Sequence, residues 1–342
     1  MNDIYKDSVI NKKHFEIEML DYIFKKITDT FSENFKLAGY IEHDPEPLIS
    51  DIDHSVRFIG STTNVFKQYL TDDVKISGKG CFLIQKCLRT RNASTFFSDD
   101  IFPEWSSYFT AMGIMSPPGN TETLLTDTLN FLLNLGIEVG KIRINVSSRD
   151  KDMLECVRNV QKKIKFIIDV DGVDNTNYYR HKYGMDEITG RNFNLAIKNE
   201  KTGEFKDIGN IVVIEKDGAS LAVEMGIGVS TLIAKIFGLD NSIEASTISK
   251  IVAFRPGFTS KFADALSTAV VMLKEGIMPG SRDKARLLRT HLRALSYFRL
   301  KLGIDLDEVK NFADKYEDEE FGEVTKIGNR ILLYLEDYEE NL

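Results

Sequence analysis

The hydrophobic pattern of the chain changes at about residue 229 from short strand-like runs to helical periodicity. The fold must therefore combine a sheet region with a following helical region. Before this change, short apolar runs are bounded by Gly, Asp or Asn, as is typical of β-strands. After it, apolar residues recur every three to four positions, as on the buried face of a helix. The candidate strands are residues 55–59, 81–88, 108–115, 141–146, 165–170, 193–198, 208–215 and 220–224.

Helical patterns are few among these strands and continuous after them. Because so few helices alternate with strands, parallel βαβ winding is disfavoured and an antiparallel sheet is preferred. We therefore predict an α+β fold, with an antiparallel sheet domain flanked by helices over residues 1–242 and an all-helical domain over residues 243–342. The predicted helices are residues 15–35, 119–135, 150–163, 230–237, 258–275, 281–302, 306–316 and 324–338.

Composition narrows the class of function. The 342 residues include 52 acidic and 44 basic ones, and the net charge of -8 argues against nucleic-acid binding through overall charge. The three cysteines lack paired spacing, which indicates a reducing compartment and small buried residues. No histidine falls at metal-ligand spacing, so we expect no zinc. The chain starts without a signal-peptide pattern and contains no long apolar run, so we expect a cytoplasmic protein outside membranes.

Several local features could carry chemistry, and each also has a simpler structural interpretation. Arg89 ends an apolar strand, where a guanidinium could hold a phosphate or lie as an ordinary surface group. Gly226 and Gly228 lie between a strand and a helix, where the backbone could approach a ligand or form only a tight turn. Nearby aromatic side chains could stack on a purine or belong to the core. They are Trp105, Tyr108 and Phe109.

Four motifs follow one another in a fixed order along most of the chain. Each motif alone is common, whereas the four together are informative. They are DHSVRFIGSTTNVFK at 53–67, QKCLR at 85–89 with SYFTAMG at 107–113, GNIV at 209–212 with VEMGIG at 223–228, and LKEGIMP at 273–279 followed by Arg289 and Arg293.

This series resembles the catalytic core and the helical tRNA-recognition domain of alanyl-tRNA synthetases, a family of class II aminoacyl-tRNA synthetases. The resemblance implies a class II antiparallel sheet that uses ATP and Mg²⁺ to activate a small amino acid, with alanine first, for transfer to tRNA or another acceptor. Catalysis would depend on Arg89, which would hold the α-phosphate. The resemblance assigns ATP to Arg89, Tyr108, Met112, Gly226 and Gly228, and the amino acid to Asn210, Val212 and Glu224.

The chain departs from the family pattern at the third motif. The family continues with G-L-E-R, whereas residues 228–231 read GVST, so Thr231 stands where an arginine would hold the ATP tail. The family's aspartate is replaced by the longer Glu224, which reshapes the amino-acid pocket. A second interpretation therefore stays open, a paralogue that binds an amino acid, a nucleotide or RNA without catalysis. If activation is retained, another cation should replace the arginine, and the candidates are Arg91, Lys182 and Arg191.

One predicted helix offers a candidate RNA surface. Over residues 281–302, four arginines lie three or four positions apart and share one helical face. The four arginines are Arg282, Arg286, Arg289 and Arg293. The alternative is a solvated face, or pairing with the acidic segments 317–320 and 336–340.

The resemblance also bears on the oligomeric state. Class II enzymes often pair through their first motif, so a homodimer is expected.

Overall fold

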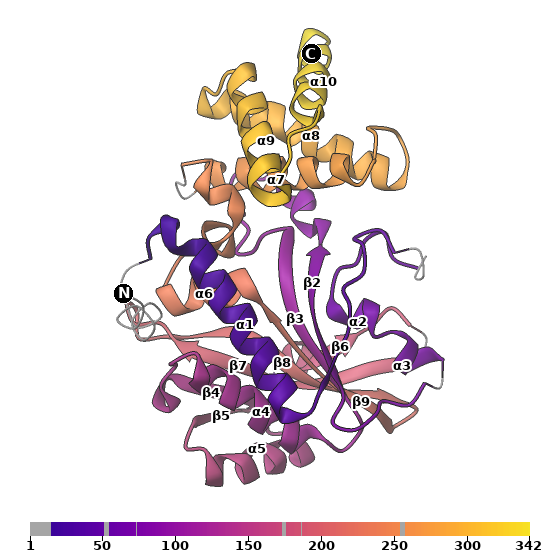
Figure 1. The fold of residues 1–342 in the computed structure, drawn as a ribbon, viewed down its shortest axis with the longest axis vertical. Coiled ribbons are helices and arrows are strands. Elements are labelled where there is room, and N and C mark those ends of the chain that lie inside the picture. The colour runs from indigo at the N-terminus through magenta and orange to yellow at the C-terminus, as the bar shows by residue number, and fades with distance from the viewer. Residues whose placement is uncertain (1–14, 51–54, 73, 173–175, 186, 254–256) are drawn as a thin grey trace.

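The computed structural model describes residues 15–50, 55–72, 74–172, 176–185, 187–253 and 257–342. Within these ranges, nine strands form one sheet in the order β1, β2, β3, β9, β8, β7, β4, β5, and β6 pairs with β7 (Figure 1). The strands are β1 Ile41–Glu42, β2 Cys81–Leu88, β3 Tyr108–Ser116, β4 Ile142–Ser147, β5 Ile167–Asp171, β6 Arg180–Lys182, β7 Ile188–Lys198, β8 Phe205–Lys216 and β9 Ala219–Gly228.

The predicted fold class is confirmed, because helices flank this sheet and an all-helical region follows it (Figure 1). None of the described helices is both long and apolar enough to cross a bilayer. The helices are α1 Leu20–Ala38, α2 Thr62–Val65, α3 Gln68–Thr71, α4 Thr121–Asn134, α5 Lys151–Lys163, α6 Val229–Phe237, α7 Phe258–Lys274, α8 Asp283–Leu302, α9 Leu306–Phe321 and α10 Ile327–Glu340.

Most neighbouring strands run antiparallel, as predicted, but two pairs are parallel. β1 runs parallel to β2, and β4 runs parallel to β5. The second pair is a βαβ unit, because α5 connects its two strands. Parallel winding was therefore wrongly disfavoured at this one place, where a 13-residue amphipathic helix is long enough to make the crossover.

The first predicted strand, residues 55–59, does not form. The chain there makes single backbone bonds, from Ile59 to the carbonyl of Leu48 and from Leu88 to that of Ile59. It then enters α2, whose first turn is closed by a capping box between Ser61 and Asn64. The capping signal follows directly on the apolar alternation, so the segment is too short for a strand.

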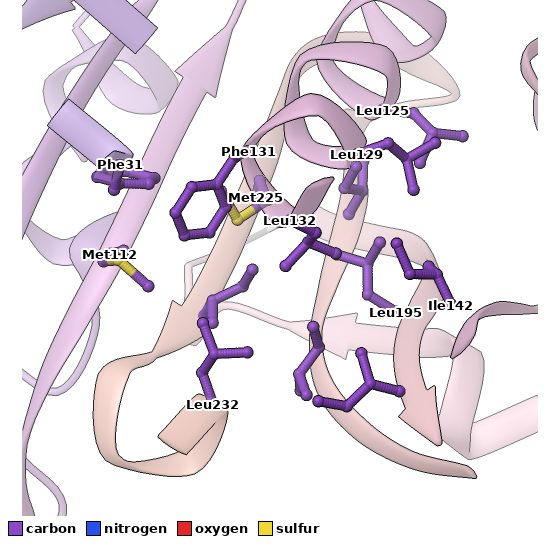
Figure 2. Close-up of a cluster of buried hydrophobic side chains, with 14 of the residues drawn as sticks. Phe31, Met112, Leu125, Leu129, Phe131, Leu132, Ile142, Leu195, Met225 and Leu232 are labelled. Atoms are coloured by element: carbon purple, nitrogen blue, oxygen red, sulfur yellow. The ribbon is translucent and has the colours of Figure 1, made fainter. Parts of the chain in front are cut away.

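The sheet has an apolar face and a polar face. Paired residues of neighbouring strands point their side chains to the same side. Met112, Leu195 and Met225 share one side, where α1, α4 and α6 cover them (Figure 2). All three side chains are fully buried, and this side forms the main core of the sheet domain. The opposite side carries polar residues and glycines, together with a smaller apolar cluster that includes Leu83, Met115 and Val212.

The C-terminal helices form a second core around α7, whose residues from Ser260 to Leu273 are all buried. Asp264 on this helix accepts hydrogen bonds from the backbone N and the hydroxyl of Ser107, at 2.6 and 2.8 Å, and from Nδ2 of Asn92 at 3.0 Å. The helical region is therefore anchored at the ends of β2 and β3 (Figure 1).

Candidate functional site

The polar face carries a continuous row of glycine and asparagine positions. Gly113 of β3 lies opposite Gly226 of β9, and Gly226 lies opposite Asn210 of β8. The row continues through Asn194 of β7 to Asn145 of β4. Glycine and asparagine are poor residues for the middle of a strand, so this row is better explained by ligand contact than by packing.

Glu224 is the acidic group of this face, two residues before Gly226. The Thr63 hydroxyl donates to its Oε1, and the Tyr183 hydroxyl donates to its Oε2 at 3.1 Å. Burial raises the pKa of Glu224, whereas the two hydroxyls and the positive charge of Arg89 lower it. The carboxylate is thus held in a fixed place by donors from α2 and from the chain after β6.

Arg89 is the basic group and follows directly after β2. Its guanidinium carbon lies 5.3 Å from the centre of the Phe109 ring, and its Nε donates to the Gly60 carbonyl. Desolvation lowers the pKa of Arg89, the positive charge of Arg91 lowers it further, and Glu224 raises it. Among the described residues, no carboxylate forms an ion pair with Arg89 or Arg91. Two neighbouring unpaired arginines are suited to an anion with several charges.

His181 of β6 borders the same polar face, next to Asn210. Its Nε2 lies 3.1 Å from Nδ2 of Asn210. With Nε2 accepting this hydrogen bond, the neutral ring carries its proton on Nδ1. Burial lowers the pKa of His181, and the positive charge of Arg89 lowers it further. At neutral pH the neutral ring therefore orients Asn210 without adding another positive charge to those of Arg89 and Arg91.

The polar face of the sheet is open to a ligand at Gly226. A Cβ atom placed on it would meet no heavy atom within 4 Å, whereas one on Gly113 would lie 2.0 Å from Oγ1 of Thr62. The predicted turn at Gly226 and Gly228 does not form, because β9 continues through Gly228 and α6 begins at Val229. A ligand would therefore approach the backbone in the middle of the sheet.

Tyr108 and Met112 lie on the other face. Met112 is fully buried in the apolar core (Figure 2). Tyr108 donates to Glu320 at 3.1 Å and lines a cavity of about 370 Å³ next to the helical region. The structure thus groups Phe109, rather than Tyr108, with Arg89.

Val212 lies on the polar face, opposite Glu224. It is buried in a small apolar cluster with Leu83 and Met115. A Cβ atom on Gly190 would lie 2.5 Å from Cγ1 of Val212, so β7 packs closely beside it. Three residues are assigned to the amino acid from the sequence, Asn210, Val212 and Glu224. All three therefore share the polar face.

The three candidate replacement cations differ in their surroundings. Arg191 forms ion pairs with Asp152 at 2.8 Å and Glu215 at 2.6 Å, and its hydrogen bonds with these two groups raise its pKa. Lys182 is exposed on β6. The charge of Arg91 acts directly on Arg89, so Arg91 is the candidate next to the basic group of the site.

The arginine face of α8 is not neutralised by the acidic C-terminal segments. Glu317 pairs with Lys274, Glu320 with Lys86, and Glu339 with Arg299. Arg293 stacks on Tyr338, with its guanidinium carbon 5.2 Å from the ring centre. No ion pair within the described ranges involves the other three, which lie exposed or half-buried and are Arg282, Arg286 and Arg289.

Sequence reasoning missed several residues that complete the site. Thr63 lies inside the first motif, so its place in that motif was a usable signal. His181 and Tyr183 lie between the second and third motifs, so no motif pointed to them. Within the described ranges, no group of three or more His, Cys, Asp or Glu side chains could hold a metal ion. The three cysteines are free and buried, as predicted.

Comparison with known proteins gives matches among solved structures alone. No protein-family model and no curated protein matches the chain. One similar structure is apo histidyl-tRNA synthetase from S. aureus, with TM-score 0.42, 15% identity, 67% of this chain and 70% of that chain covered. A second is asparaginyl-tRNA synthetase from Pyrococcus horikoshii complexed with asparaginyl-adenylate, with TM-score 0.41, 10% identity, and 67% and 68% covered. A third is the RNA binding domain of threonyl-tRNA synthetase from Cryptosporidium parvum, with TM-score 0.43, 9% identity, and 80% and 79% covered.

Proposed function

We propose that the polar face of the sheet activates an amino acid with ATP and forms an aminoacyl-adenylate, as class II aminoacyl-tRNA synthetases do. The proposal rests on one arrangement. The charges of Arg89 and Glu224 interact across the polar face of the sheet, which is open at Gly226. A guanidinium and a carboxylate on one face can hold a phosphate and an ammonium group close together.

Arg89 is assigned to the α-phosphate of ATP, with Arg91 beside it for the remaining phosphates. Phe109 supplies an aromatic face for adenine, and Gly226 and Gly228 allow the nucleotide to approach the strand backbone. Catalysis of phosphoryl and nucleotidyl transfer depends mainly on positioning and on neutralising phosphate charge. These residues supply both, so no nucleophilic side chain is needed.

Glu224 is assigned to the ammonium group of the amino acid, with Asn210 and Val212 lining its place. A buried carboxylate whose pKa is raised gains most from a cationic partner, which an ammonium group would supply. The substrate carboxylate then attacks the α-phosphorus, an oxygen–phosphorus bond forms, and pyrophosphate leaves. Alanine is the first candidate substrate because of the motif series.

Mg²⁺ is expected to arrive with ATP and to neutralise phosphate charge when bound. Both oxygens of Glu224 already accept hydrogen bonds, from Thr63 and Tyr183. Mg²⁺ in nucleotide sites is held largely by phosphates and water. The donor set of this site therefore fits a phosphate-bound ion, and no protein ligand is assigned to it.

The arginine face of α8 is assigned to the phosphate backbone of tRNA or of another RNA acceptor. Within the described part of the chain, Arg282, Arg286 and Arg289 form no ion pair and Arg293 stacks on Tyr338, which leaves their charge available. Sequence-independent phosphate contacts of this kind position an RNA rather than identify it.

Amino-acid-dependent exchange of pyrophosphate into ATP tests this proposal. The assay uses alanine, glycine and serine first, then the other amino acids, with and without Mg²⁺. We expect exchange with one amino acid or a few similar ones. Absence of exchange with every amino acid would contradict adenylation, and ligand binding seen by calorimetry in that case would indicate the non-catalytic paralogue instead.

A further inference from the structure

A second cavity lies beside β4 and the start of β8, lined from the polar face by Asn145 and Asp207 and from α6 by Lys235. Its volume is about 320 Å³, at the lower end of the range for small-molecule sites. Along the row of paired residues, Asn145 at this cavity is three strands from Gly226, or roughly 14 Å at the usual strand spacing. None of the residues assigned above to ATP or the amino acid lines it.

The cavity contains two carboxylates, Glu104 and Asp207, and neither forms an ion pair within the described residues. Asp207 accepts hydrogen bonds from Nδ2 of Asn145, at 3.1 Å, and from the hydroxyl of Tyr178. No lysine, arginine or histidine of the described ranges forms an ion pair with it. Burial raises the pKa of Asp207, and the more distant charges of Arg143 and Lys235 lower it without reversing the shift.

Cations line the same cavity with unused hydrogen-bond donors. The Nε of Arg143 is buried without a hydrogen-bond partner, and the guanidinium carbon of Arg143 lies 4.6 Å from the centre of the Phe205 ring. Its Nη1 reaches Asp169 at 3.3 Å, outside the cavity lining. Lys235 of α6 lines the cavity and has no ion-pair partner among the described residues.

An unused acceptor lies beside Asp207. Asn145 is 8% exposed, and its Oδ1 is buried without a hydrogen-bond partner. Buried polar groups without partners are rare in folded proteins, and each calls for a partner that the chain does not supply. The cavity is thus lined by two carboxylates, Asp207 and Glu104, and by three cations, Arg143, Lys206 and Lys235, of which Lys206 already pairs with Glu204.

We propose that this cavity binds a free α-amino acid, with its ammonium group at the carboxylates of Asp207 and Glu104 and its carboxylate between Arg143 and Lys235. A simple anion would leave Asp207 facing negative charge, and a simple cation would face Arg143 and Lys235. A small zwitterion satisfies both sets. The rings of Tyr178 and Phe205 supply apolar walls for its side chain.

Calorimetric titration of the full chain with single amino acids tests the proposal. The Glu224→Gln background removes the ammonium partner of the first site, so that remaining binding reports on the cavity. We expect one amino acid or a few to bind, and Asp207→Asn and Lys235→Gln each to weaken binding at least tenfold. Lys198→Gln, an exposed lysine on β7, is the matched control and should bind as the background does.

Ligand analogues decide the question if a variant fails to fold, which circular dichroism would reveal. The carboxamide and the N-acetyl form of the best ligand should both lose binding, because each lacks one charge. The proposal is overturned if no amino acid binds at millimolar concentration. It is equally overturned if the folded Asp207→Asn and Lys235→Gln variants, or both analogues, bind unchanged. These outcomes do not depend on adenylation, which the exchange assay measures separately.

Discussion

Tyr183 donates a hydrogen bond of 3.1 Å to Oε2 of Glu224. Tyr183 follows directly after β6, whereas Glu224 lies in β9, so this contact joins two separate parts of the polar face. Burial keeps the pKa of Glu224 raised even with two hydroxyl donors beside it. Burial of a carboxylate in this state costs stability, and that cost can be measured.

We expect Glu224→Gln to stabilise the fold and abolish amino-acid activation. Glutamine keeps the shape and removes the buried charge, and the Thr63 and Tyr183 hydroxyls can each donate or accept. The gain should be about 1 kcal/mol at pH 7, or roughly 2 °C in Tm. Thermal unfolding and pyrophosphate exchange measure the two effects, and a variant that is both less stable and active would contradict the assignment.

The pH dependence of this gain has a definite sign. A carboxyl group whose folded-state pKa is raised binds its proton more tightly in the folded protein. Its contribution to stability is therefore present below the unfolded pKa, about 4.3, and is lost as the pH rises through the folded pKa. The stability difference between Glu224→Gln and wild type should vanish in acid and grow towards neutral pH, as measured by urea denaturation across that range.

We expect Arg89→Ala to lower the rate of exchange by roughly 30- to 1000-fold, because one phosphate contact in such a site contributes about 2 to 4 kcal/mol to the transition state. Arg89→Lys should recover part of the rate, since a point charge cannot make the bidentate contact. Arg158→Ala, an exposed arginine on α5, is the matched control. An Arg89→Ala variant with unchanged ATP affinity and rate would remove Arg89 from the site.

Strands and long helices could be predicted from sequence where apolar spacing was decisive. β2 has the predicted bounds, Cys81–Leu88, and α7 differs from its prediction by one residue. β9 was predicted to end at Glu224 because two glycines follow. It continues to Gly228 because β3 pairs with it on one side and β8 on the other, and these ladders outweigh glycine's low strand propensity.

The placement of the candidate residues was predicted only in part. Motif order predicted Arg89, Asn210 and Glu224 together, and they share one face, but it assigned the aromatic role to Tyr108 rather than to the adjacent Phe109. That choice depends on strand register, since adjacent side chains of a strand point to opposite faces. β3 pairs with β2 and β9 so that Phe109 shares the face of Arg89 and Tyr108 does not.

We expect the arginine face of α8 to bind RNA through phosphates. Changing Arg282, Arg286 and Arg289 together to glutamine should weaken binding of tRNA and lower the slope of log K against log salt by about 0.7 to 0.9 per lost contact. Thermal stability should stay unchanged, since these side chains form no ion pair within the described ranges. Titration at several salt concentrations checks this prediction.

The control for this face is a triple change of exposed lysines at the end of α5, Lys162, Lys163 and Lys165. It removes the same charge from another surface and should leave the salt slope as in wild type. Equal losses in both triple variants would indicate a general charge effect and argue against a specific RNA surface.

The anchor between the sheet and the helical region should be sensitive to Asp264. Asp264→Ala leaves the Ser107 backbone N, the Ser107 hydroxyl and the Asn92 amide without their acceptor. We expect a loss of at least about 3 kcal/mol in the free energy of unfolding, because these donors are buried. Urea denaturation measures the loss. Asp337→Ala, an exposed aspartate on α10, should stay within about 0.5 kcal/mol of wild type.

Substitutions of two glycines on the polar face distinguish a position open to a ligand, Gly226, from a packed position, Gly113. A methyl group on Gly226 enters open space, so Gly226→Ala should fold with a Tm close to that of wild type. The same group should obstruct a ligand at the backbone and raise the KM for ATP or the amino acid at least tenfold. At Gly113 a methyl group would overlap Thr62, so Gly113→Ala should lower stability by about 1 to 3 kcal/mol. Thermal unfolding and exchange kinetics on both variants check this prediction, and unaltered kinetics in Gly226→Ala would show that no substrate crosses the polar face there.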